Sequence, residues 1–83
     1  MKTNPLVKQI ANLAGEKKAE DLVALNVSKI TSLSDYFIIC SAKNMIQVKA
    51  IADNIRDNIK EKPWRTEGYE NANWIIIDYV DIV

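Results

Sequence analysis

Three aspartates come closest, by type and spacing, to a catalytic or metal-binding site in this sequence. Asp78 and Asp81 form an Asp-x-x-Asp pattern, and Asp35 lies elsewhere in the chain. Carboxylates grouped in this way can hold a divalent cation. Alternate side chains of a strand point to opposite faces, so Asp78 and Asp81 diverge unless a turn intervenes. The alternative is that Asp78 ends a strand and contacts a partner or a turn amide.

Several kinds of chemistry are excluded by the residue types that the sequence lacks. It contains no His, so it cannot build a Ser-His or Cys-His nucleophile or a His-ligated zinc site. A single cysteine, Cys40, allows neither an internal disulfide nor a four-thiolate metal site. It also has no glycine-rich phosphate loop. Cys40 suits a reducing compartment, most simply the cytosol, and is interpreted as a small buried hydrophobe.

Aromatic and acidic residues gather toward the end of the sequence. Trp74 and Tyr79 begin and end an apolar segment, and four acids but no Lys or Arg occur between Thr66 and Val83. One interpretation is an acidic, aromatic surface for a basic partner, because Trp and Tyr are common anchors of interfaces. The other is ordinary core packing beside a solvated polar face. The sequence leaves both open.

Length and composition limit the architecture that can position these residues. The chain has 83 residues, 48% of them hydrophobic, which predicts one folded domain over residues 1–83. No apolar run approaches the roughly 20 residues of a membrane span, and the first residues lack a secretory pattern. With 11 basic and 11 acidic side chains the net charge is zero, so no general attraction to nucleic acid is expected.

Two helices are predicted from periodicity and end signals. The first runs from about Asn4 to Lys18, because Asn4-Pro5 is a start signal and apolar residues follow at helical spacing. The second begins after Asn44, where Gln47 completes a capping-box pattern, and ends near Glu61 ahead of Pro63.

Three strands are predicted around the second helix. Asp21 to Val27 is a short strand, and Tyr36 to Ser41 is apolar on both faces, which is typical of a central strand covered on both sides. Asn73 to Tyr79 follows a turn at Glu67-Gly68, and pairing of these last two strands would complete a parallel, right-handed βαβ unit. A new apolar segment, Asp81 to Val83, would leave an unpaired sheet edge. The predicted fold class is α/β with a small mixed sheet.

Five motifs, in order, resemble one known family. They are Lys18-Ala-Glu-Asp21-Leu22, Ser34-Asp35-Tyr36-Phe37-Ile38-Ile39, Gln47-Val48-Lys49-Ala50-Ile51-Ala52-Asp53, Glu67-Gly68-x-x-x-Ala72-x-Trp74 and Asp78-Tyr79-x-Asp81. From about Ile10 to Val83 the chain resembles the Iojap or ribosomal silencing factor (RsfS) family. The resemblance implies a nucleotidyltransferase-like topology that lacks the catalytic motif, no enzyme activity and no cofactor or metal.

The resemblance also implies a partner and a surface. Members of the family bind the large ribosomal subunit through ribosomal protein L-fourteen, block subunit joining and repress translation under nutrient limitation, in the cytoplasm. Organelle relatives act in large-subunit assembly. The carried-over partner residues are Trp74, Asp78, Tyr79 and Asp81, with Glu67 as an addition. No membrane and no sequence-specific nucleic acid is implied as a partner.

The sequence departs from the family pattern at three places. Val80 replaces a Gly between the tyrosine and the second aspartate, and Asn44-Met45-Ile46-Gln47 lacks the usual Arg. The family's final strand and C-terminal helix have no counterpart, so the resemblance implies a domain that is incomplete at its C-terminus.

Two other hypotheses remain beside ribosome silencing. The α/β unit and the carboxylates would suit a residual nucleotide-binding or nucleotidyltransferase-like domain. An unpaired sheet edge would suit an assembly module that forms a homodimer.

Overall fold

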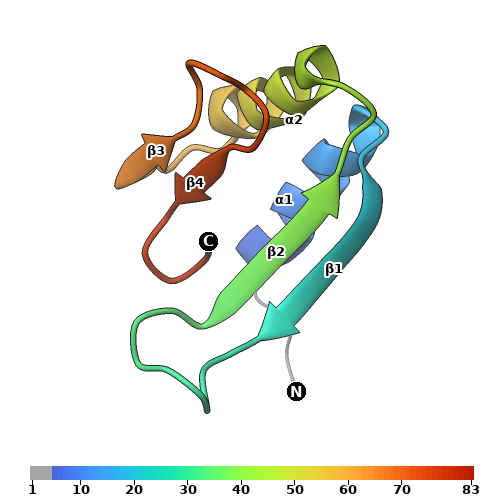
Figure 1. Ribbon diagram of the computed structural model, residues 1–83. Helices are drawn as coiled ribbons and strands as arrows, with labels where there is room; N and C mark the ends of the chain where they lie inside the picture. Colours follow the sequence, from blue (N-terminus) through green and yellow to red (C-terminus); the bar gives the residue numbers. More distant parts are fainter. Residues whose placement is uncertain (1–4) are drawn as a thin grey trace.

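Two helices and two short β-ribbons make up the computed structural model of the protein, which describes residues 5–83 (Figure 1). The elements in chain order are α1 (Pro5–Glu16), β1 (Glu20–Asn26), β2 (Tyr36–Ser41), α2 (Met45–Asn58), β3 (Arg65–Glu67) and β4 (Ile76–Asp78). The predicted α/β class with two main helices is therefore confirmed. None of the helices in residues 5–83 has the length and apolar character needed to cross a membrane.

The first helix follows its apolar periodicity. Val7, Ile10, Leu13 and Ala14 are buried, so one face of α1 packs into the core. The helix ends at Glu16, two residues before the predicted end, and the Lys18 amide donates to the Gly15 carbonyl at 2.9 Å. The predicted start signal includes Asn4, which lies outside the described residues.

The second helix begins with the predicted cap. The Asn44 side chain accepts a hydrogen bond from the Gln47 amide at 2.9 Å, which satisfies one of the free amides of the first turn. The Gln47 side chain donates to the carbonyls of Lys17 and Lys18, at 3.1 and 3.0 Å, and so ties α2 to the end of α1. The helix ends at Asn58 rather than near Glu61, with Ile59 as its C-terminal cap.

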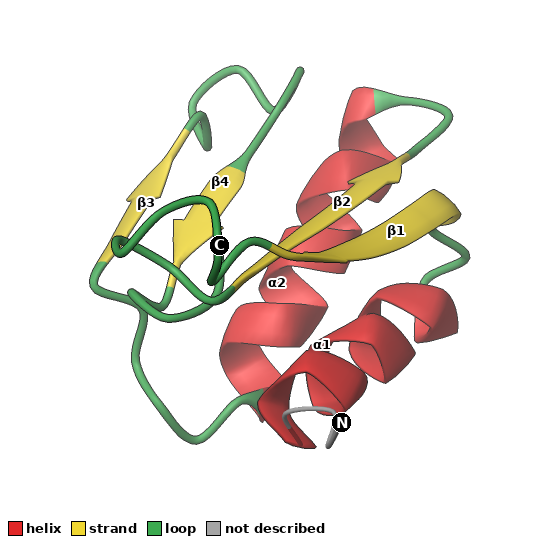
Figure 2. Ribbon diagram, turned by 90° about the horizontal axis from the view of Figure 1, so that it is seen from below, coloured by secondary structure: helices red, strands yellow, loops and turns green. Residues whose placement is uncertain are grey.

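The ribbon of β1 and β2 is antiparallel and is covered on one face. Its register pairs Val23 with Ile39 and Leu25 with Phe37, and these four side chains are exposed on the outer face. The alternate residues of β2, such as Ile38, pack against the core. The prediction that β2 is covered on both faces was wrong within residues 5–83, because both helices lie on one side of the ribbon (Figure 2).

The predicted parallel pairing of β2 with the last strand was also wrong. The regular strand is only Ile76–Asp78, and it pairs antiparallel with β3, an element that was not predicted. The turn at Glu67-Gly68 helps to bring Arg65–Glu67 alongside as a local partner. The parallel contact of β2 is made instead by Ile82, which bridges to Tyr36.

Ile82 joins the two ribbons to the helices. It is only 2% exposed and belongs to the core cluster with residues of α1 and α2, such as Ile10 and Ile55. Figure 2 shows the segment after β4 lying between the two ribbons. The apolar segment that was predicted to begin at Asp81 therefore completes the core.

Candidate functional site

The chain reverses sharply after β4, in a segment that we call the β4 turn (residues 78–82). The Asp81 amide donates to the Tyr79 carbonyl at 2.9 Å, and the Tyr79 amide donates to the Ile82 carbonyl at 2.9 Å. Val80 lies between them with φ at +72°. A hydrogen bond from the amide of residue i+2 to the carbonyl of residue i, around a central residue with positive φ, defines a γ-turn of the non-inverse type. This turn is rare and strained. The β-branched side chain of Val80 makes this conformation still less favourable.

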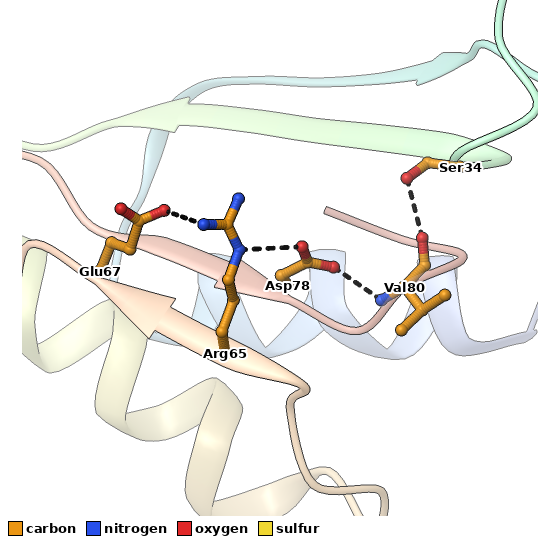
Figure 3. A network of polar contacts seen from close by, with 5 residues as sticks. All are labelled: Ser34, Arg65, Glu67, Asp78 and Val80. Carbon is orange, nitrogen blue, oxygen red and sulfur yellow. Dashed lines mark hydrogen bonds and ion pairs between the residues drawn. The ribbon is translucent and has the colours of Figure 1, made fainter.

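Two hydrogen bonds hold the backbone of Val80 in this conformation (Figure 3). The Val80 amide donates to Asp78 Oδ1 at 2.8 Å, and the buried hydroxyl of Ser34 donates to the Val80 carbonyl at 2.8 Å. Strained backbone of this kind costs about 1–3 kcal/mol and persists where its surroundings impose it. Asp78 therefore contacts a turn amide, which was one of the two roles predicted for it.

Arg65 pairs with two of the four acids. Its Nη1 lies 2.7 Å from the Glu67 carboxylate, and its Nε lies 3.4 Å from Asp78 Oδ2 (Figure 3). Arg65 precedes the acid-only stretch in the sequence, but β3 pairs with β4 and brings it between the two carboxylates. Within residues 5–83 only Glu70 and Asp81, of the four acids, form no ion pair. The surface is thus less acidic than the sequence predicted.

Trp74 is displayed by the loop between β3 and β4. Its side chain is exposed, at 58% of the residue surface, and its backbone closely approaches Gly68. Gly68 has φ at +89°, and a Cβ at this position would lie 2.1 Å from the Trp74 carbonyl oxygen. Only glycine fits both the backbone conformation and the space. The close approach to Gly68 therefore constrains the position of the Trp74 backbone.

The five predicted partner residues separate into two groups. Trp74, Asp81 and Glu67 are exposed. The Asp78 side chain is only 14% exposed, and Tyr79 packs against the core cluster. Burial raises the pKa of the Tyr79 hydroxyl, which has no hydrogen-bond partner within the described residues. The structure places Glu67 and Trp74 at the start of β4, and Asp78, Tyr79 and Asp81 at its other end and beyond.

Two residues of this region were missed by the sequence analysis. No role was predicted for Ser34 or for Arg65. Neither carries a sequence signal for its role, because Ser34 meets Val80 across 46 residues and Arg65 reaches Asp78 through strand pairing. A structure is needed to find such contacts.

The carboxylates do not assemble into a cation site. Residues 5–83 contain no group of three or more His, Cys, Asp or Glu side chains placed to hold a metal ion. Asp78 already accepts hydrogen bonds from the Val80 amide and the Arg65 guanidinium.

Relaxing the strained turn should stabilise the protein. We expect Val80→Gly to raise the free energy of unfolding by about 1 kcal/mol, because Gly adopts positive φ freely and Val80 is exposed enough to lose little packing. Urea unfolding followed by circular dichroism measures the change. Val23→Gly is the matched control, since Val23 is similarly exposed but is not among the residues with positive φ, and it should lower stability by a similar amount. A loss of stability in both variants would contradict the strain at Val80.

Comparison with known proteins places this arrangement in a family. A family described as ribosomal silencing factor during starvation matches residues 1–83, the whole chain. The chain belongs to the ribosomal silencing factor family. A ribosomal silencing factor from Halalkalibacterium halodurans is 38% identical over 86 residues, covering 100% of this chain and 74% of that protein. The Bacillus subtilis ribosomal silencing factor is 35% identical, covering 100% of this chain and 73% of that protein.

Solved structures agree with this assignment. A crystal structure from Chromobacterium violaceum superposes with a TM-score of 0.92 at 28% identity, covering 99% of this chain and 71% of that chain. One from Bacillus halodurans superposes with a TM-score of 0.84 at 38% identity, covering 93% and 74%. The resemblance seen in the sequence motifs is confirmed. The ribosomal silencing factor relatives carry names that describe a regulatory role rather than a reaction.

Proposed function

We propose that the protein binds the large ribosomal subunit through ribosomal protein L-fourteen and sterically blocks association with the small subunit, repressing translation under nutrient limitation. The observation that carries the proposal is the exposed Trp74 in the loop between β3 and β4, in a chain that matches the silencing factor family over its whole length. Such a role needs a surface that binds the ribosome and enough volume to obstruct the small subunit, but no catalytic group or cofactor. It would place the protein in the cytoplasm.

The contact surface that we propose is built from residues that point outward. Trp74 supplies an apolar anchor of the type that dominates interface energies, Glu67 supplies negative charge beside it, and Asp81 supplies negative charge beyond the other end of β4. Ribosomal proteins are commonly basic, so complementary charge would speed the encounter and select the partner. The charge of Glu67 is offset in part by Arg65, which leaves Asp81 as the stronger electrostatic contributor.

Asp78 and Tyr79 act indirectly in this proposal. Asp78 holds the Val80 amide, and Tyr79 contributes both backbone hydrogen bonds that define the turn. Their roles are therefore to shape the β4 turn and to position Asp81. Asp78→Asn keeps the size of the side chain and an acceptor for the Val80 amide, so this variant should weaken binding less than the loss of Trp74.

The proposal is tested by co-sedimentation with purified large subunits. We expect Trp74→Ala to weaken binding by about 2 kcal/mol, or roughly 30-fold, because a buried aromatic anchor would be lost. Trp64→Ala is the matched control, since Trp64 is also exposed, at 69%, but lies at the end of β4 opposite Trp74, where its amide donates to the Asp78 carbonyl. It should change binding less than twofold.

Two controls separate binding from folding and from mechanism. Circular dichroism and urea unfolding should show that both tryptophan variants remain folded. Equal binding by the two variants, or loss of the fold with Trp74→Ala, would contradict the role of Trp74. Light scattering of mixed subunits should show slower joining when the protein is present, and binding without this effect would contradict the steric mechanism.

A further inference from the structure

The loop between β3 and β4 (residues 68–75) is closed by a hydrogen bond of its own. The Ala72 amide donates to the Gly68 carbonyl at 2.8 Å, and the two residues have positive φ, at +55° and +89°. A single bond from residue i+4 back to residue i is an α-turn. The close approach of the Trp74 backbone to Gly68 joins Trp74 to this turn. Tyr69 lies inside the turn, so a contact that holds Tyr69 also holds Trp74.

Arg56 of α2 makes such a contact with Tyr69. The guanidinium carbon Cζ lies 4.9 Å from the centroid of the Tyr69 ring, within the roughly 6 Å over which a cation is attracted to an aromatic face. Both ion pairs among residues 5–83 involve Arg65, so no carboxylate of this part of the chain pairs with Arg56. Arg56 occupies the last turn of its helix, where the helix dipole favours a positive charge.

The contact is one between a cation and a neutral aromatic ring. Burial raises the pKa of the Tyr69 hydroxyl, so this side chain carries no charge at physiological pH and forms no ion pair with Arg56. Arg56 also lies near the hydroxyl, but not in hydrogen-bond geometry, because the buried oxygen has no hydrogen-bond partner within the described residues. The attraction therefore depends on the face of the ring and on the positive charge above it.

The apolar core gives this loop little support. None of residues 68–75 belongs to the core cluster or to the apolar side chains packed against it, whereas Ile77 and Tyr79, beyond the loop, do. Ala72 is buried, but Trp74 is exposed. The orientation of the loop therefore depends on its own turn, on the strands at its two ends and on the contact of Tyr69 with α2.

We propose that Arg56 is a positioning residue for the partner surface: by holding the Tyr69 ring against α2, it keeps the β3–β4 loop, and Trp74 with it, in the orientation that binds the partner. This inference rests on the ribosomal function proposed above. Arg56 acts through Trp74 and not by contact with the ribosome. Without Arg56 the loop would sample other orientations, and the apparent affinity would fall with the fraction of molecules in the binding-competent one.

Three variants separate the charge of Arg56 from its other properties. Arg56→Met keeps a long side chain and removes the charge, whereas Arg56→Lys keeps a cation that can lie over the ring. Lys60→Met is the matched control, since it removes the same charge four residues further on, from an exposed side chain that lies over no aromatic ring within residues 5–83. Circular dichroism checks that all three variants are folded.

Co-sedimentation with increasing amounts of purified large subunits gives the affinities. We expect Arg56→Met to weaken binding about three- to fivefold, which is the range of an exposed contact between a cation and an aromatic ring. Arg56→Lys and Lys60→Met should each change binding less than twofold. Equal losses in the two methionine variants would overturn the proposal, because the charge and not its place over Tyr69 would then matter. An equal loss in Arg56→Lys would overturn it as well.

A double-mutant cycle shows whether Arg56 acts through Trp74. In a Trp74→Ala protein, Arg56→Met should have no further effect on binding, because the anchor that Arg56 positions is gone. A residue that only supports the fold, or one that touches the ribosome directly, would lower the affinity by the same factor in both backgrounds. That result would overturn the proposal.

Amide relaxation of the free protein, measured by NMR, tests the positioning role without the ribosome. The order parameter of the Trp74 amide should fall from about 0.85, typical of a rigid backbone, to below about 0.6 in Arg56→Met, and it should stay high in Lys60→Met. No change in Arg56→Met would overturn the positioning role. If the unaltered protein does not bind large subunits, the ribosomal function fails, and this measurement alone decides whether Arg56 positions the loop.

Discussion

Gly68→Ala should lower the free energy of unfolding by about 3 kcal/mol or more. Two independent effects add at this position. The φ of +89° is unfavourable for any residue with a Cβ, and the new Cβ would lie 2.1 Å from the Trp74 carbonyl oxygen. Because that neighbour is backbone, relief requires movement of the loop that carries Trp74. Urea unfolding followed by tryptophan fluorescence and circular dichroism measures the loss.

The second glycine of the chain provides the control. A Cβ at Gly15 has no heavy atom within 4 Å, and the residue lies in the last turn of α1. Gly15→Ala should therefore raise stability by about 0.5–1 kcal/mol through helix propensity. The same chemical change is expected to have opposite signs at the two sites. A neutral Gly68→Ala would show that the loop does not approach Gly68 as described.

Ile82→Ala should lower the free energy of unfolding by about 3–4 kcal/mol. Ile82 is 2% exposed and contacts a core made by both helices, so truncation leaves a cavity as well as losing apolar burial. At 0.05–0.15 kcal/mol per residue, the whole protein has roughly 4–12 kcal/mol of stability. The variant should thus be partly unfolded at room temperature if the protein is at the lower end of this range. Its urea midpoint gives the value.

Ile30→Ala is the appropriate comparison for Ile82→Ala. Ile30 is 84% exposed, in the connection between β1 and β2, and the same atoms are removed. Exposed substitutions of this kind usually change stability by no more than about 0.5 kcal/mol. Similar losses in the two variants would mean that Ile82 does not occupy the core.

Short-range signals in the sequence correctly predicted β1, β2, the cap of α2 and the turn after β3. The bounds of β2 were predicted correctly, β1 was displaced by one residue, and the Asn44 cap and the Glu67-Gly68 turn were located. Each has a strong local cause, namely a β-branched run, a side chain that caps its own helix, or a glycine. Such causes operate over a few residues and can be seen without knowing the rest of the fold.

Strand pairing and the direction of side chains could not be obtained in this way. The three residues of β3 are too short to show a period, so the antiparallel partner of β4 was missed and β2 was assigned in its place. The same omission hid Arg65, and with it the inward orientation of Asp78. The sequence left Trp74 open between an interface anchor and a core residue, and its exposure became visible only in the structure.

The position of Ile82 in the sequence also bears on how the chain folds during synthesis. The contact between Ser34 and Val80 closes a span of 46 residues, and Ile82 follows directly. Helices and the β1–β2 ribbon can form from local contacts as the chain emerges, whereas closing this long loop carries an entropic cost that is offset only when Ile82 packs into the core. The core is thus completed only after residue 82 has left the exit tunnel, and until then the nascent chain presents its apolar interior to solvent and to chaperones.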